Sequence, residues 1–179
     1  MKWTLPFLLI AQPALAELCP AAPDHSDRID AIIAELGMAP TELDARVLSD
    51  EVWTLWTDAP DDRAQEMLDE GMRKREGYDF LGARDTLDGL VEYCPDYAEG
   101  YNQRAFASFL RQDYAAALYD LDRALELNPH HFAALSGRAL TLMGLGRMEE
   151  AQASLRAAVA LNPWLRERSL LTPEPGTEL

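Results

Sequence analysis

The chain has 179 residues, of which 48% are hydrophobic and 26% are charged, so it can form one domain with a modest core and is too apolar for general disorder. Its 16 Lys and Arg stand against 31 Asp and Glu, which gives a formal net charge of −15. An acidic excess of this size, with no basic stripe to offset it, argues against nucleic acid and anionic membranes as partners.

The first 16 residues have the organisation of a secretory signal peptide. Lys2 supplies a positive charge, Trp3 to Ile10 form an apolar stretch, and Ala14-Leu15-Ala16 provides the small residues of a cleavage site. An ordinary N-terminal helix would instead need polar residues at helical spacing, and Thr4 is the single one between Lys2 and Gln12. We therefore expect cleavage after Ala16, export to the periplasm, and no membrane insertion of the mature chain, because the apolar stretch is too short to span a bilayer.

Two cysteines follow the predicted leader, Cys19 and Cys94. In an oxidising compartment an even pair favours a disulfide, which would tie the mature N-terminus to the middle of the chain. Two unconnected thiols are the alternative. A catalytic thiol is not indicated, because neither cysteine belongs to a Cys-x-x-Cys pair or stands beside a histidine.

An internal repeat occupies the second half of the chain. Three related endings, Glu92-Tyr93-Cys94-Pro95, Glu126-Leu127-Asn128-Pro129 and Ala160-Leu161-Asn162-Pro163, place their prolines 34 residues apart. This is the period of a helix-turn-helix array. Small residues recur in register between the prolines, and larger ones stand among them. The small residues are Gly71, Ala83, Ala105, Ala117, Ala124, Ala139, Ala151 and Ala158, and the larger ones are Leu87, Leu121 and Leu155.

This joint pattern resembles the tetratricopeptide repeat over roughly residues 63–165. The resemblance implies an all-α solenoid of helical hairpins with three units, 64–97, 98–131 and 132–165. The early Trp position of the consensus holds Met67, Tyr101 and Leu135 instead. The turns inside the units are expected near Gly77, near Gln112-Asp113, and at Gly144-Leu145-Gly146, because glycine can supply the positive φ that ends a helix.

The flanking segments are less regular. Residues 17–62 carry two apolar patterns of helical spacing, and we interpret them as a degenerate N-terminal helical pair that covers the open face of the first full repeat. Residues 166–179 are expected to form a short cap that packs on the last repeat, followed by a loose tail.

The resemblance also implies a concave groove lined by the first helix of each repeat. The positions used by family members that grip chaperone carboxylates hold Leu68, Met72, Gln103, Ala133 and Gly137 here, so that clamp is missing. An apolar stripe replaces it, suited to an amphipathic helix or an extended apolar peptide. The predicted partner-binding residues are Leu68, Met72, Asn102, Gln103, Phe106, Phe109, Ser136, Leu140 and Met143. The N-terminal helices could instead fold back and fill the groove.

Signatures of catalysis are absent from the sequence, which has no phosphate-binding Gly-rich loop, no Gly-x-Ser-x-Gly and no His-Glu-x-x-His. The adjacent histidines His130 and His131 follow Pro129 and are interpreted as solvated linker residues rather than metal ligands. We expect no enzyme activity, cofactor or metal. The leading hypothesis is a periplasmic adaptor that binds a protein or peptide partner. The alternative is a binder of a small hydrophobic ligand in the same groove, and the oligomeric state stays open between monomer and homo-oligomer.

Overall fold

The computed structural model describes residues 18–173, and over this span the chain folds into helices without a β-strand. The α-helices are α1 Ser26–Met38, α2 Glu42–Trp56, α3 Asp62–Glu76, α4 Phe80–Tyr93, α5 Ala98–Leu110, α6 Tyr114–Leu127, α7 Phe132–Gly144 and α8 Met148–Leu161, and the 3-10 helix η1 Arg166–Leu170 follows them. The predicted all-α fold class is confirmed. The predicted leader and its cleavage site after Ala16 lie outside the described residues. Between residues 18 and 173, no helix is both long and apolar enough to cross a membrane.

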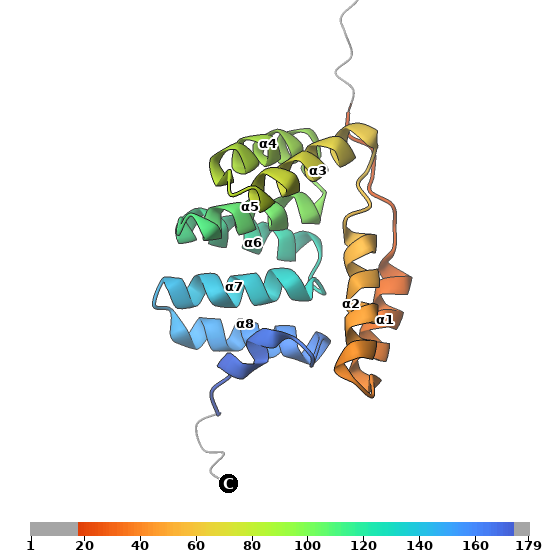
Figure 1. Cartoon of the computed structure of the whole chain (residues 1–179), viewed down its shortest axis with the longest axis vertical. Helices are drawn as coiled ribbons and strands as arrows, with labels where there is room; N and C mark the ends of the chain where they lie inside the picture. Colours follow the sequence, from red (N-terminus) through yellow and green to blue (C-terminus); the bar gives the residue numbers. More distant parts are fainter. Residues whose placement is uncertain (1–17, 174–179) are drawn as a thin grey trace, which may run out of the picture.

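Helices α3 to α8 stack as successive antiparallel hairpins (Figure 1), in which α3 pairs with α4, α5 with α6 and α7 with α8. Neighbouring hairpins also pack on one another through α4 and α5 and through α6 and α7. The C-cap residue of the second helix in each hairpin is Cys94, Asn128 or Asn162, directly before a repeat proline. Proline stops these helices because it has no N–H donor and disfavours helical backbone in the residue before it.

Each hairpin turn contains one residue in the left-handed region. These residues are Tyr78, Gln112 and Gly146, with φ of 64°, 62° and 74°. The glycine expected to end the first of these helices, Gly77, has φ of −78° instead. A tyrosine therefore takes the left-handed place in the first hairpin, at a position equivalent to Gln112 and Gly146 in the repeat.

The small residues of the repeat lie where two helices approach closely. Ala83, Ala117 and Ala151 are fully buried. A Cβ atom added to Gly71 in α3 would come within 2.6 Å of Cγ of Leu87 in α4. Helices α3 and α4 therefore approach too closely for any residue but glycine at this position. The larger leucines fill the remaining volume between the helices.

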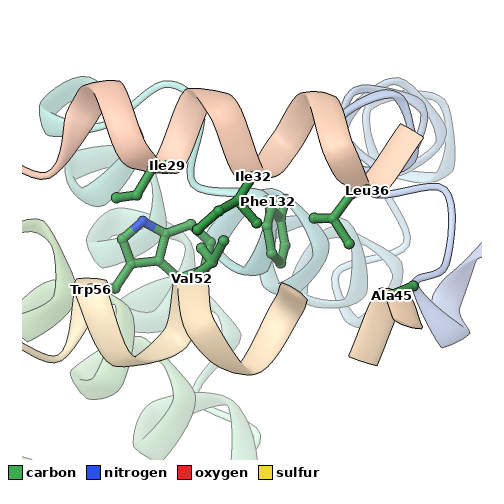
Figure 2. Close-up of a cluster of buried hydrophobic side chains, with 7 residues drawn as sticks. All are labelled: Ile29, Ile32, Leu36, Ala45, Val52, Trp56 and Phe132. Atoms are coloured by element: carbon green, nitrogen blue, oxygen red, sulfur yellow. The ribbon is translucent and has the colours of Figure 1, made fainter. Parts of the chain in front are cut away.

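The N-terminal helices α1 and α2 form a separate hairpin with its own core (Figure 2). Ile29, Ile32 and Leu36 of α1 face Val52 and Trp56 of α2, and all five side chains are buried. Thr41 caps α2, because its side chain accepts a hydrogen bond from the N–H of Asp44.

The position of this hairpin differs from the expected cover on the first repeat. It runs along one end of the stacked helices (Figure 1), and its core continues into Phe132 of α7 and the partly buried Trp164 and Leu165 after α8. Without the N-terminal hairpin, these aromatic and aliphatic residues would be exposed at the end of the last hairpin. Packing the apolar face of α1 and α2 there removes the apolar surface of both partners from solvent.

The predicted C-terminal cap packs on α8 as a 3-10 helix. The side chain of Gln152 in α8 donates to the carbonyl of Leu170 at 2.9 Å and accepts from the N–H of Thr172 at 2.8 Å. These two bonds anchor the chain where it leaves the last hairpin.

Candidate functional site

A pocket of about 270 Å³ opens between α5 and α7. Trp53 of α2 and Glu167 of η1, which both lie outside the repeats, complete its wall together with Leu165 at the end of the last repeat. The side chains that line it are Trp53, Arg75, Asn102, Gln103, Ala105, Phe106, Phe109, Leu121, Ala133, Ser136, Gly137, Leu140, Thr141, Leu165 and Glu167. The lining is largely apolar, with a single cationic side chain, Arg75, and a single carboxylate, that of Glu167.

Six of the nine predicted groove residues line this pocket. They are Asn102, Gln103, Phe106, Phe109, Ser136 and Leu140. The other three lie between helices: Leu68 is fully buried, Met72 packs against the same core around Leu87, and Met143 packs beside Leu142. The helical period alone does not distinguish the pocket face of a helix from the face that meets its hairpin partner.

The α2 helix occupies part of the expected groove without filling it. Trp53 contributes to the pocket wall and stays 37% exposed, and Phe106 on the facing wall is 45% exposed. The groove is therefore shortened to a pocket. It is neither fully open nor filled by the N-terminal helices.

A buried polar network centred on Glu99 lies beside the pocket. The Glu99 carboxylate accepts from Nε2 of Gln103 at 2.5 Å, from Nδ2 of Asn102 at 3.2 Å and from His131 at 2.7 Å. Gln103 in turn accepts a hydrogen bond from the guanidinium of Arg75. The network therefore links α3, α5 and the start of α7, and it supplies the partners that a buried carboxylate requires.

His131 is fully buried, which corrects its interpretation as a solvated linker residue. Its Nδ1 accepts from the N–H of Ala134 at 3.2 Å as the N-cap of α7, so the ring proton is assigned to Nε2, which donates to Glu99. The ring of Trp56 stacks on His131 with a centroid separation of 3.7 Å. The sequence signal that was missed is the cap position, because the residue before a helix often bonds its first turn.

The neighbouring His130 does lie in solvent. Its side chain is 58% exposed and its Nδ1 lies 3.0 Å from Oδ1 of Asp30 in α1. Two adjacent histidines therefore have opposite environments, because the N-terminal hairpin covers only one of them.

Arg75 carries its charge into a mostly apolar surrounding. Burial lowers the pKa of its guanidinium from the ordinary value. The guanidinium carbon lies 4.6 Å from the ring centroid of Phe106, within the range of a cation–π contact. The nearest carboxylate oxygen belongs to Glu76, at 3.8 Å, and Glu99 lies one side chain away through Gln103.

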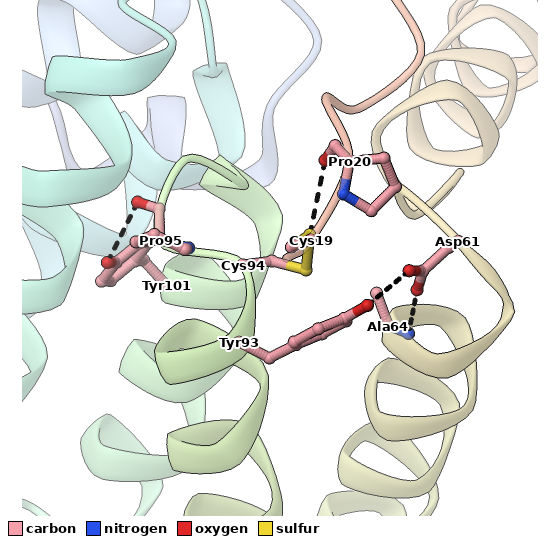
Figure 3. The surroundings of a disulfide bond; sticks show 8 residues. All are labelled: Cys19, Pro20, Asp61, Ala64, Tyr93, Cys94, Pro95 and Tyr101. Atoms are coloured by element: carbon pink, nitrogen blue, oxygen red, sulfur yellow. Dashed lines mark hydrogen bonds between the residues drawn. A yellow bond between two sulfur atoms is a disulfide. The ribbon is translucent and has the colours of Figure 1, made fainter. Parts of the chain in front are cut away.

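Cys19 and Cys94 are joined by a disulfide (Figure 3), with a Cα–Cα distance of 5.2 Å. It ties the segment before α1 to the end of α4. Beside it, the hydroxyl of Tyr93 donates to Asp61 at 2.7 Å. The N–H of Ala64 and this hydroxyl both bond Asp61, and they hold the pKa of its carboxyl below the ordinary value.

Among residues 18–173, no group of three or more His, Cys, Asp or Glu side chains is arranged to hold a metal ion. The site offers an apolar pocket with aromatic walls, one partly buried cation and a network of buried hydrogen bonds.

A family model described as tetratricopeptide repeat matches residues 108–163. A TPR repeat-containing protein of Rhizobium etli is 28% identical over 126 residues, which cover 70% of this chain and 62% of the relative. The tetratricopeptide repeat protein 36 homolog of Nematostella vectensis is 43% identical over 72 residues, or 40% of each chain. The chain thus spans less than two thirds of the length of these curated relatives.

Solved structures agree in fold. The first TPR of Spaghetti, bound to an HSP90 peptide, has a TM-score of 0.59 at 23% identity and covers 60% of this chain and 86% of that chain. The TPR2B domain of yeast Sti1, in a complex named for pHsp70, has a TM-score of 0.55 at 24% identity and covers 56% of this chain and 81% of that chain. Together with the repeat period and the stacked hairpins, the family match over residues 108–163 identifies these helical hairpins as tetratricopeptide repeats.

Proposed function

We propose that this chain is an exported, non-enzymatic adaptor that binds a segment of a partner protein in the pocket between α5 and α7. The observation that carries the proposal is the pocket itself, which is apolar, aromatic and partly open on the face where the first helices of the repeats meet. Solved relatives in fold are bound to HSP90 and Hsp70 peptides, which supports a peptide as the kind of ligand.

The volume of the pocket favours a side chain over a free ligand of drug or lipid size. Sites for such ligands occupy about 300 to 1,000 Å³, whereas this pocket holds about 270 Å³. One or two anchoring side chains of a peptide would fill it, with the rest of the peptide lying across the exposed rim at Phe106.

Photo-crosslinking in the native cell tests the binding surface. A benzophenone amino acid placed at Phe106 should capture a partner chain, and the same amino acid at Tyr119 should not, because Tyr119 is exposed on α6 and does not line the pocket. When the benzophenone amino acid is placed at another residue of the pocket rim, the substitution Phe106→Ala should also weaken capture of the partner. Equal capture from both probe positions, or none from Phe106, would contradict the proposed site.

Export is proposed from the predicted leader and is supported by the disulfide, since such bonds persist in oxidising compartments and are rare in the cytosol. Rapid alkylation of whole cells tests it. The full chain should fractionate with the periplasm and leave both cysteines unmodified until a reductant is added, whereas a chain without residues 2–16 should stay cytosolic with reactive thiols. Cytosolic fractionation of the full chain would refute export.

A further inference from the structure

We infer that the side chain received by the pocket is the phenol of a tyrosine, an aromatic ring whose uncharged polar tip can both accept and donate a hydrogen bond. The inference rests on the proposed adaptor function and names the class of side chain that the pocket selects. Its grounds are the size of the pocket, the donors on its wall and the charges around them.

The ring follows from volume and lining. A dry apolar cavity of about 150 Å³ is enough to bind benzene, so a pocket of about 270 Å³ has room for a substituted ring. Phe106 and Phe109 of α5 and Trp53 of α2 offer aromatic surface to an occupant, and aromatic pairs add stabilisation beyond the area that they bury.

The polar tip follows from groups on the wall that have donors to spare. A guanidinium has five N–H donors, and one of those of Arg75 bonds Gln103. Ser136 is 5% exposed, lines the pocket, and its hydroxyl has no hydrogen-bond partner within the described part of the chain. A fully apolar occupant would leave these groups desolvated without new partners, which is costly.

The absence of charge on the tip follows from the surrounding carboxylates. Glu76 lies 3.8 Å from Arg75, Glu99 is linked to it through Gln103, and Glu167 stands in the pocket wall. Glu76 and Glu99 act on the Arg75 guanidinium and Glu167 adds a third carboxylate to the pocket wall, so acidic groups outnumber the single cation on a chain of net charge −15. An incoming carboxylate would meet net repulsion, whereas a phenol can accept a hydrogen bond from Arg75 without adding charge.

Three probes test this on the full mature chain: toluene, p-cresol and p-toluate, which share the methylphenyl ring and differ in the tip. The readout is the NMR signal of the Trp53 indole N–H, because Trp53 lines the pocket. We expect p-cresol to bind about tenfold more tightly than toluene, as one hydrogen bond to a charged group would give, and p-toluate to bind no better than toluene. Equal binding of toluene and p-cresol, tightest binding of p-toluate, or no shift of Trp53 with any probe would overturn the inference.

Two serine variants assign the effect to the pocket. Ser136→Ala should reduce the preference for p-cresol over toluene. Ser108→Ala should leave that preference unchanged, because Ser108 is also buried with an unpartnered hydroxyl but does not line the pocket. Both variants remove one buried hydroxyl, so a general loss of stability would affect them alike. Equal loss of the preference in both would overturn the assignment to Ser136.

Blocked tripeptides extend the test to a peptide-borne ring. Acetyl-Ala-Tyr-Ala-amide should bind about tenfold more tightly than its Phe counterpart, and failure of both peptides to bind while p-cresol binds would overturn the tyrosine inference. The crosslinking test separates this outcome from the adaptor function. Capture at Phe106 without a phenol preference would support the adaptor proposal and refute the tyrosine inference. A phenol preference without any captured partner would support the preference of the pocket and refute the adaptor proposal.

Discussion

Replacing His131 tests whether the Glu99 network stabilises the junction between the N-terminal hairpin and the repeats. His131→Ala removes the cap on the N–H of Ala134, which should cost about 1 kcal/mol. It also takes one hydrogen bond from the buried carboxylate of Glu99, about 1 to 2 kcal/mol, and the stack on Trp56, about 1 kcal/mol. We expect the free energy of unfolding to fall by about 3 to 4 kcal/mol in total.

Urea unfolding of the oxidised chain, followed by circular dichroism at 222 nm, measures this loss. His130→Ala is the matched control, because His130 is exposed and its pair with Asp30 should contribute at most about 1 kcal/mol. His131→Asn keeps a good capping side chain and should recover about 1 kcal/mol of the loss. If His131→Ala destabilises the chain no more than His130→Ala does, the network does not stabilise the junction.

Five further variants probe the repeats and their edge in the same unfolding assay. Gly71→Ala should destabilise the chain by about 1 to 3 kcal/mol through overpacking, whereas Gly89→Ala, where the nearest atom would lie 3.8 Å from the new Cβ, should stabilise it by about 0.5 to 1 kcal/mol. Asp120→Asn should cost about 3 kcal/mol because the Asp120 side chain is only 4% exposed in its ion pair with Arg104. Asp122→Asn should cost less than about 1 kcal/mol, because Asp122 is 48% exposed in its ion pair with Arg138, the residue equivalent to Arg104 one repeat later. Burial raises the pKa of Tyr97 well above its usual value of about 10. Above pH 10 the unfolded chain therefore binds fewer protons than the folded chain, and the free energy of unfolding should fall as the pH rises. Tyr97→Phe should flatten this fall.

The repeat architecture could be predicted from the sequence because its signals are local or periodic. Pro95, Pro129 and Pro163 end helices through their own backbone chemistry, and the small residues in register fit only where two helices approach closely. The sequence predicted the left-handed residue of the first turn at Gly77, and the structure has it at Tyr78. This shift of one residue leaves the hairpin unchanged. The pocket residues from α5 and α7 followed from the same period.

The placement of the N-terminal hairpin could not be predicted in this way. The apolar spacing in α1 and α2 shows that each helix has a face to bury, but it does not name the surface that receives that face. The contact between Trp56 and His131 joins residues far apart in sequence, and it decides that one histidine is buried while its neighbour stays in solvent. The missed wall residues, Trp53 and Leu165, depend on the same long-range packing.

The segments outside the repeats therefore determine what the repeats can bind. Trp53 can form a pocket wall only while α2 is held against α7, and two attachments hold it there: the core that reaches Phe132, and the disulfide that fixes the segment before α1 to the end of α4. The first attachment positions Trp53 directly, and the second limits how far the hairpin can move if the first opens. Because the repeats supply α5 and α7 but not Trp53 or Glu167, a repeat array of the same sequence without these segments would present a longer and shallower apolar face. The selectivity that we infer for a single aromatic side chain is accordingly a property of the assembled chain and not of the tetratricopeptide repeats alone.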